Sequence, residues 1–384
     1  MNSSPQRNVT ESGRGQLIRA SLMLARTLRR LVRAVARPLL RALGWRGAQL
    51  RGVNGQGERI IAEIREIHAR YVKLASDAVR LIAARRPSRR GAPISRGVCI
   101  VRTQGRRIDL MAEAIASVEV QSVPMQVLLV THGNNEAFSR VKAWQQSSGS
   151  SAICLHAGVA GRRRGYPANV GLDYISQHAQ EFDFLCFLDD DDILYPYFAS
   201  RMAEVLDLCD ADLVYAQANQ RDAWQAPKQG GNLLPPMCLL GGNFIVMNSF
   251  ALRVEAWVES QVFFSEEMEY LEDWHFLLKL LDRGVVFEPL FETLSEYRLL
   301  GDGNASVKKL PLLYSAGIHR IEAACFELLS SSDASNFYAD VSHFDFSSRE
   351  PLTSGEVAVI EGARKKFEMA RRTLKPAALP PEGA

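Results

Sequence analysis

Four consecutive aspartates, Asp189 to Asp192, directly follow the apolar run FDFLCFL. The run is typical of a buried strand, and adjacent carboxylates repel one another unless a cation or a basic group compensates them. Mg²⁺ and Mn²⁺ prefer oxygen ligands, often one or two carboxylates together with phosphate oxygens. The aspartates therefore indicate a site for a divalent metal and a diphosphate. The alternative is an acidic turn that caps the next helix, because Asp is a favoured N-cap residue.

The elements that must position these aspartates follow a strand–helix alternation that starts at Gly97. Short apolar runs alternate with helical stretches, which predicts an α/β fold with a parallel sheet covered by helices on both faces. In such sheets ligands bind at the carboxyl ends of the strands, where the aspartates are expected to lie. The expected elements span 97–103, 108–120, 125–130, 136–146, 151–155, 169–177, 182–188, 198–208 and 211–216.

The rest of the chain divides by composition and pattern. After Ser306 we expect helices over 310–329 and 354–374, and the sequence ends in AALPPEGA. The expected parts are a disordered start (1–13), a helical arm (14–86), a linker (87–96), the α/β domain (97–306), a helical extension (307–376) and a disordered tail (377–384).

The first helix of the arm, over 16–44, carries arginines on one face and leucines and valines on the other. This pattern is typical of a helix that lies in a membrane interface and is held by anionic lipids. Packing against the protein's own α/β domain is an equal alternative. An organelle transit peptide also fits the composition, whereas no nucleic-acid partner is expected because no aromatic residues alternate with the arginines. The arginines are Arg19, Arg26, Arg30, Arg33, Arg37 and Arg41.

The second helix of the arm, over 58–86, has apolar residues at alternating spacings of four and three. Such a heptad seam indicates either a homodimeric coiled coil or a hairpin with the first helix.

The bulk composition is that of an ordinary globular protein, with 47% hydrophobic and 23% charged residues and a net charge of +3. The six cysteines are scattered without zinc-ligand spacing, which indicates free thiols in a reducing compartment. No apolar run reaches the ~18–20 residues that span a bilayer. We therefore expect a cytoplasmic protein, either free or peripheral on the inner face of the cell membrane.

Six motifs resemble, in order, those of the inverting glycosyltransferases of family 2. The aspartate run resembles the DxD region of that family. The resemblance extends from Cys99 to Ser306 and implies the GT-A fold, a Rossmann-like, mostly parallel sheet sandwiched by helices. It also implies a nucleotide-sugar donor used with Mn²⁺ or Mg²⁺. In chain order, the motifs are Cys99–Arg106, Gln121–Pro124, Asn169–Leu172, Asp189–Asp192, Leu271–Trp274 and Tyr297–Arg298.

The resemblance also implies residue roles. Asp191 is the expected principal metal ligand, supported by Asp189, although which of the four aspartates touches the ion stays open. Asp273 is the expected general base, and Glu272 orients it or binds the acceptor. An inverting transfer needs one base on the acceptor side and charge stabilisation at the leaving diphosphate, which these two motifs supply. The expected donor site comprises Thr103, Arg106, His132, Asn134, Arg164, Asn169, Asp189 and Asp190, and the expected acceptor site Gly242, Asn243 and Trp274.

Two departures from the family pattern affect the donor site. The second strand ends in VTHGN without an acid, so His132, Asn134 or Asn135 must hold the nucleotide, or the donor binds differently. Ala168 stands where the family usually has arginine, and the upstream arginines 162–164 are the expected substitutes at the diphosphate. Their alternative is a solvated basic loop.

These patterns favour a glycosyltransferase that acts on a glycan or a lipid-linked acceptor in cell-surface polysaccharide or lipopolysaccharide biosynthesis. The missing acid favours a second hypothesis, a non-catalytic scaffold that binds nucleotide or glycan. A nucleotidyltransferase is a third, since only a faint glycine-containing basic loop, Thr103–Arg107, follows the first strand.

Overall fold

The computed structural model describes residues 93–158, 164–209, 211–222, 228–229, 233–299, 311–330 and 354–373. The chain divides into two compact units, Met1–Arg85 and Arg86–Ala384, and all described residues belong to the second unit. The predicted disordered ends, the basic helix over 16–44 and the heptad helix over 58–86 lie outside the described residues.

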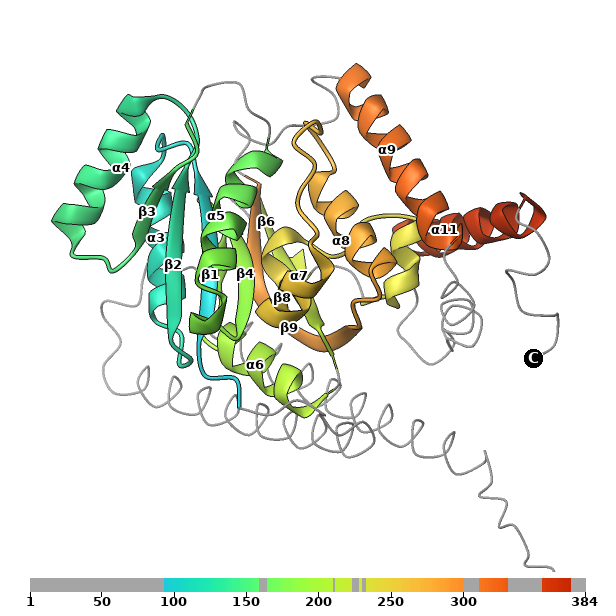
Figure 1. Ribbon diagram of the computed structural model, residues 1–384, viewed down its shortest axis with the longest axis horizontal. Coiled ribbons are helices and arrows are strands. Elements are labelled where there is room, and N and C mark those ends of the chain that lie inside the picture. Colours follow the sequence, from blue (N-terminus) through green and yellow to red (C-terminus); the bar gives the residue numbers. More distant parts are fainter. Residues whose placement is uncertain are drawn as a thin grey trace, which may run out of the picture. The chain divides into compact units, whose positions relative to one another are not determined.

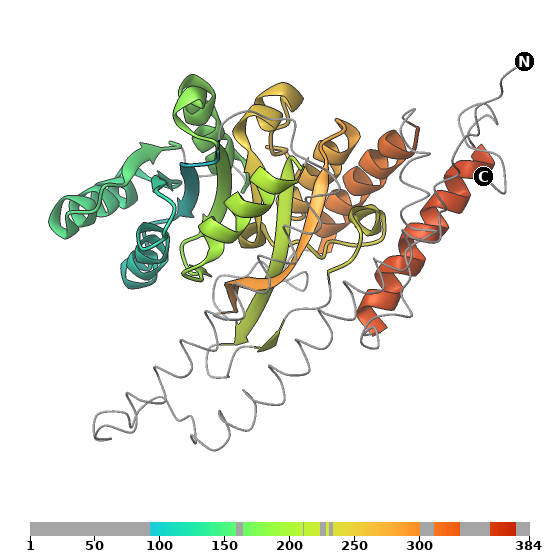
Figure 2. The same cartoon turned by 90° about the horizontal axis from the view of Figure 1, so that it is seen from below.

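The first half of the sheet is parallel (Figure 1). Its strands are apolar and mostly buried because helices cover both faces. Helices α3 and α5 lie on opposite faces (Figure 2). The strands, in spatial order, are β3 (Ile153–His156), β2 (Met125–Thr131), β1 (Gly97–Thr103) and β4 (Phe184–Asp189). The helices are α3 (Ile108–Glu119), α4 (Asn135–Ser148) and α5 (Gly165–Gln177), and a short turn, η2 (Ala179–Glu181), precedes β4.

The chain reverses its direction across the sheet between β1 and β4. It runs outward from β1 through β2 to β3, and then returns to place β4 on the other side of β1. Such a switch point opens a crevice at the carboxyl ends of the two strands, where α/β proteins bind ligands. Arg102 of β1 and Asp189 of β4 are direct neighbours across this point.

The second half of the sheet is mixed. Strand β8 runs antiparallel to both β4 and β6, whereas β9 runs parallel to β6. The α/β fold with a sheet between helices is therefore confirmed, and the sheet is entirely parallel only as far as β4, beyond which parallel and antiparallel pairs are mixed. Among the described residues the sheet has nine strands. The remaining ones are β5 (Ile193–Leu194), β6 (Leu213–Asp222), β7 (Lys228–Gln229), β8 (Phe250–Arg253) and β9 (Phe287–Leu299).

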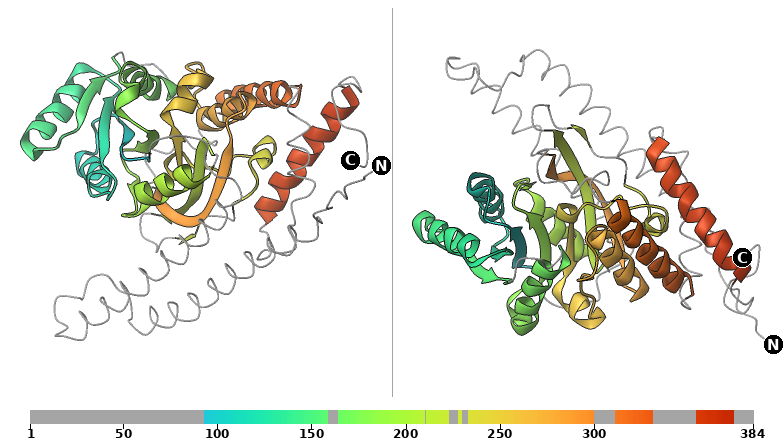
Figure 3. Two further views of the ribbon diagram at one scale, coloured as in Figure 1. Left: turned by 60° about the horizontal axis from the view of Figure 1, so that its bottom comes forward. Right: turned by 90° about the horizontal axis from the view of Figure 1, so that it is seen from above.

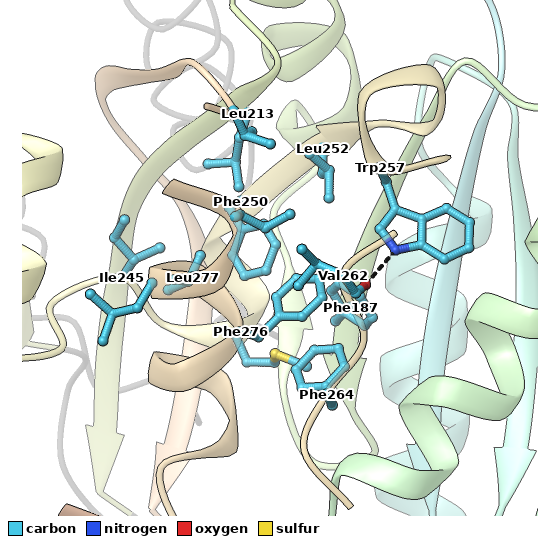
Figure 4. Close-up of a cluster of buried hydrophobic side chains, with 14 of the residues drawn as sticks. Phe187, Leu213, Ile245, Phe250, Leu252, Trp257, Val262, Phe264, Phe276 and Leu277 are labelled. Carbon is cyan, nitrogen blue, oxygen red and sulfur yellow. Dashed lines mark hydrogen bonds between the residues drawn. The ribbon is translucent and has the colours of Figure 1, made fainter. Parts of the chain in front are cut away.

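Aromatic packing fixes the second half against β4 (Figure 4). Phe187 of β4 contacts the rings of Phe250, Phe264 and Phe276, and the last two stack with centroids 4.1 Å apart. Because Phe276 lies one turn into α8 (Glu272–Asp282), this cluster fixes the start of α8 relative to β4. Nearby elements are α6 (Phe198–Leu208), η4 (Met247–Ser249) and α7 (Val254–Ser260).

Two further helices follow the sheet, α9 (Pro311–Ser330) and α11 (Ser354–Thr373), and they agree with the predicted stretches 310–329 and 354–374. Helix α9 packs along α8, and α11 packs on the short helix η3 (Pro236–Leu240) (Figure 3). Within the part of the chain that the structure describes, no helix is long and apolar enough to cross a bilayer.

Candidate active site

The guanidinium group of Arg102 connects the two acidic motifs. Its Nε and Nη2 atoms lie 2.8 and 2.7 Å from Oδ1 of Asp189, and its Nη1 atom lies 3.4 Å from Oε1 of Glu272. Nη1 also donates to the carbonyl oxygen of Arg164, 3.1 Å away. The Arg102 side chain is 6% exposed. The end of β4, the start of α8 and the start of α5 therefore meet at one buried cation.

These groups line a cavity of about 200 Å³. Asp189 and Asp192 of the aspartate run and Glu272 and Asp273 of the second motif face it, together with two arginines and two tyrosines, whereas Asp190 and Asp191 lie outside its lining. The lining residues are Arg102, Arg164, Asp189, Asp192, Val246, Met247, Tyr270, Leu271, Glu272, Asp273 and Tyr297. A larger hollow of about 530 Å³ lies between α3 and α4 and contains no group of either motif, so we assign the chemistry to the smaller cavity.

The other three aspartates contact different groups. Thr103 donates its hydroxyl to Asp190 over 2.6 Å, and Arg107 lies 2.9 Å from Asp191 and 3.5 Å from Asp190. Asp192 accepts the backbone N–H of Arg298 over 2.9 Å. The repulsion expected within the run is thus relieved by one hydroxyl, one backbone amide and three arginines, Arg102, Arg107 and Arg164.

The charge states of the run differ accordingly. Burial acts to raise the pKa of Asp189, but Arg102 and Arg164 outweigh it and hold that pKa below its usual range. Burial raises the pKa of Asp190, Asp191 and Asp192, most strongly for Asp192, which also faces Asp189. Asp189 is therefore the most firmly ionised carboxylate of the run.

The carboxylates fit a divalent ion that binds together with a diphosphate. Among the described residues, no group of three or more His, Cys, Asp or Glu side chains could hold a metal alone. Mg²⁺ and Mn²⁺ need fewer protein ligands, because they keep waters and take phosphate oxygens next to one or two carboxylates. Asp189 and Asp191, at the switch point, offer hard oxygen donors of this kind.

Asp273 is held by two hydrogen bonds at the start of α8. Its Oδ1 atom accepts the backbone N–H of Trp274 over 2.8 Å, and its Oδ2 atom accepts the side chain of Asn243 over 3.0 Å. Burial and the neighbouring Glu272 raise the pKa of Asp273 to about 6. A carboxylate with this pKa is ionised at neutral pH and more basic than an ordinary aspartate, which suits a general base.

The residue before this pair adopts a strained backbone. Leu271 has φ 65°, a left-handed conformation that is uncommon for residues other than glycine. Strain of this kind persists only where the surrounding packing imposes it, and it often occurs at functional sites. The strain supports the assignment of Glu272 and Asp273 to a site rather than to an ordinary helix start.

Two further expected donor residues, His132 and Arg106, lie at the same end of the sheet as Thr103, Arg164, Asp189 and Asp190. Burial and the charge of Arg102 lower the pKa of His132 to about 4, so its ring is neutral at pH 7 and can exchange hydrogen bonds with an uncharged group. Arg106 is exposed and contributes to the same lowering. Arg107, which the sequence analysis did not single out, makes the ion pairs with the aspartates.

Other expected site residues have packing partners instead. Asn134 caps α4, accepting the N–H of Ala137 over 2.9 Å. Asn169 uses its amide nitrogen and oxygen on the backbone of Phe264, at 3.0 and 2.9 Å, and so ties α5 to the segment before α8. Its side chain points to that segment and not to the aspartates.

The expected acceptor residues are divided. Asn243 donates a side-chain hydrogen bond to Asp273, which lines the cavity. Trp274 is 7% exposed and donates its Nε1–H to the carbonyl of Leu239 over 2.7 Å, and Gly242 packs against Val359 of α11. The structure thus gives Trp274 and Gly242 packing contacts close to the site.

Sequence reasoning also gave no role to Arg102. Its signal is visible in the sequence, because it is the one charged residue in the strand GVCIVRT and it precedes Thr103 at the strand's carboxyl end. A charged residue in a buried strand requires a partner, and here the partners come from two distant motifs.

Gly241 allows α11 to pack close to the site. A Cβ atom at Gly241 would overlap the carbonyl oxygen of Val359 and lie 2.6 Å from the backbone nitrogen of Ala363. We expect Gly241→Ala to lower the free energy of unfolding by about 1–3 kcal/mol, the usual cost of overpacking. Urea unfolding of the two proteins measures this change. An unchanged midpoint would contradict the close packing of α11 on this loop.

No protein-family model matches the chain, and no curated protein matches it either. Solved structures that are similar include TarS 1-349 of S. aureus, with 13% identity over 73% of this chain and 93% of that chain and a TM-score of 0.45. The same protein in complex with UDP-GlcNAc has 12% identity over 73% of this chain and 90% of that chain, with a TM-score of 0.46. The mannosyltransferase PcManGT from Pyrobaculum calidifontis, in complex with GDP-Man and Mn²⁺, has 12% identity over 79% of this chain and 85% of that chain, with a TM-score of 0.42. At these identities and TM-scores the similarities do not support a functional assignment, and the proposed function rests on the residues of the site.

Proposed function

We propose that the chain is a glycosyltransferase that transfers a sugar from a nucleotide-sugar donor to a glycan or lipid-linked acceptor, with inversion. We place this reaction in cell-surface polysaccharide or lipopolysaccharide biosynthesis. The observation that carries the proposal is the cavity that joins Asp189 to Asp273. One wall combines aspartates with arginines at a sheet switch point, and the other presents a single carboxylate of raised pKa.

The first wall suits a nucleoside diphosphate. Arg102 and Arg164 line the cavity beside Asp189, and Arg107 lies next to it against Asp191; all three supply positive charge for phosphate oxygens. Asp191 and Asp189 would hold Mn²⁺ or Mg²⁺ there. When bound, such an ion stabilises the charge that develops on the leaving diphosphate. His132, neutral at pH 7, is available to hydrogen-bond the nucleoside.

The second wall suits the acceptor. Asp273 takes the proton from the attacking hydroxyl, and Asn243 and the Trp274 backbone amide hold its two oxygens in place. Glu272 contributes by raising the basicity of Asp273 and by contacting Arg102. Because an inverting attack comes from the face opposite the leaving group, a base across the cavity from the diphosphate is the required arrangement.

The division of the chain belongs to the same proposal. Residues 97–306 form the catalytic domain, and 307–376 extend it. In this proposal, the helix that the sequence predicts over 16–44 binds an anionic membrane surface, and the helix predicted over 58–86 forms a homodimer. Such an anchor favours a lipid-linked acceptor and a position on the inner face of the membrane.

A non-catalytic scaffold is the second candidate. It is favoured by the end of β2, which carries no acid, and by Asn134, whose side-chain oxygen caps α4. A non-catalytic scaffold does not explain the strained backbone of Leu271 or the raised pKa of Asp273.

The pH dependence of transfer follows from the base. Asp273 works only when deprotonated, so activity is expected to rise with pH up to about 6 and to level off above it. Below that pH the rate should fall about tenfold for each pH unit. Initial rates between pH 4.5 and 8.5, at saturating donor, measure the profile. A rate that is flat from pH 4.5 to pH 7 would contradict the assignment.

Calorimetric titration of the full chain with nucleoside diphosphates, with and without Mn²⁺, tests the proposed donor site. We expect one nucleotide to bind and Mn²⁺ to strengthen its binding. Folded protein that binds none of them, with or without the ion, would favour the scaffold.

A further inference from the structure

The chain carries its own cation between the two acidic motifs. Arg102 lies opposite Asp189 in the register of β1 and β4, so both side chains point to the same face of the sheet. Its guanidinium group bonds Asp189 and contacts Glu272, and it is almost completely buried. A buried guanidinium with two carboxylate partners is fixed in place far more firmly than a surface ion pair.

A second arginine reinforces this arrangement. Arg164 lies 3.8 Å from Asp189 and 3.7 Å from Glu272, and its side chain is 40% exposed. Asp189 and Glu272 are thus paired with two guanidinium groups of the chain itself. A divalent cation that approaches Asp189 in this state meets a compensated carboxylate and two like charges.

We propose that Arg102 is a positioning residue that acts as the resident counter-ion of Asp189 and Glu272 and keeps the free enzyme from binding a divalent ion. The proposal rests on the proposed function, because a diphosphate is the group that changes the balance. Its oxygens attract the guanidinium groups of Arg102 and Arg164 and release the charge of Asp189 to the metal. Metal and nucleotide therefore enter together, and the metal alone binds weakly.

The test is the affinity of the full chain for Mn²⁺ without nucleotide, measured by calorimetry and by the electron paramagnetic resonance signal of free Mn²⁺. We expect Arg102→Gln to bind Mn²⁺ at least tenfold more tightly than the unchanged protein, and Mn²⁺ to raise its melting temperature more. Arg102→Lys keeps the charge and should behave like the unchanged protein. A merely structural role for Arg102 would not produce this dependence on charge.

Arg283→Gln is the matched control, because Arg283 is exposed at the C-terminal end of α8, away from Glu272. It should leave Mn²⁺ affinity unchanged. If Arg102→Gln does not fold, as judged by circular dichroism, Arg164→Gln removes the more exposed partner of the same two carboxylates. It should tighten Mn²⁺ binding in the same direction.

Equal Mn²⁺ affinity in the unchanged protein and in a folded variant would overturn the proposal, as would tight Mn²⁺ binding by the unchanged protein alone. These outcomes are separate from the proposed function, which is tested by nucleotide binding. If the chain binds no nucleotide but Arg102→Gln binds Mn²⁺ more tightly, the proposed function is wrong and the counter-ion role of Arg102 still holds.

Discussion

Replacing Asp273 by asparagine is expected to lower the rate of sugar transfer by about 10²–10⁴-fold, the usual contribution of a general base. Asparagine fills the same space and can keep a hydrogen bond to Asn243 or to the Trp274 backbone. It cannot accept the proton of the attacking hydroxyl. Nucleotide binding is therefore expected to stay within about threefold, because the proposed diphosphate site is at the aspartate run and not at Asp273. Transfer rates and calorimetric affinities measure the two quantities.

The stability of this variant separates a lost base from a lost fold. The folded-state pKa of Asp273 is raised, so the protein loses stability as pH rises from the ordinary range of aspartate through about 6. Asparagine removes that loss, and the melting temperature at pH 8 should be equal or higher. Asp282→Asn, at the other end of α8, is the control and should transfer normally. Normal turnover by Asp273→Asn would refute the assignment of the base.

Replacing Asp191 by alanine is expected to abolish the part of nucleotide binding that depends on Mn²⁺. The unchanged protein should bind its nucleotide more tightly with the ion than without it, whereas the variant should show no difference. The reason is that Asp191 supplies a hard oxygen at the end of β4 where a metal and a diphosphate would meet. Calorimetric titrations with and without Mn²⁺ give both affinities for each protein.

Removal of Asp191 also takes from Arg107 the closer of its two carboxylate partners, at 2.9 Å, and leaves Asp190 at 3.5 Å. The guanidinium, now less compensated, can attract the diphosphate, so nucleotide binding without metal should be kept or slightly strengthened. Asp173→Ala, on the exposed face of α5, is the control for the loss of one negative charge. A variant at Asp191 that keeps the full Mn²⁺ effect would shift the metal to another aspartate of the run.

The parallel half of the sheet could be predicted from the sequence because β1, β2 and β4 are continuous apolar runs. A strand buried on both faces must be apolar along its length, so the pattern is clear. Strand β9 lacks this signal, since Glu292 and Glu296 interrupt it. Both are buried with arginine partners, Glu292 with Arg201 at 2.6 Å and Glu296 with Arg221 at 2.8 Å. Pairs between distant segments are not visible as a local pattern.

The site was predictable to a similar extent. The aspartate run could be located because adjacent carboxylates need a compensating cation or basic group. Glu272 and Asp273 could be located by the resemblance of Leu271–Trp274 to a family motif. The network between the two acidic motifs could not be predicted, because Arg102 meets Glu272 only after the sheet and α8 have packed. Asn169 shows the opposite case, in which a polar residue at a motif position is used for tertiary contact.

The central claim is that one cavity holds the nucleotide at Asp189–Asp192 and the base at Asp273. Its most direct test is a crystal of the full chain soaked with Mn²⁺ and the nucleoside diphosphate that binds, measured at a wavelength where manganese scatters anomalously. We predict an anomalous peak within metal–ligand distance of Asp191 or Asp189, next to the diphosphate and facing Asp273 across the cavity. A nucleotide bound elsewhere, or a peak away from the aspartates, would contradict the account.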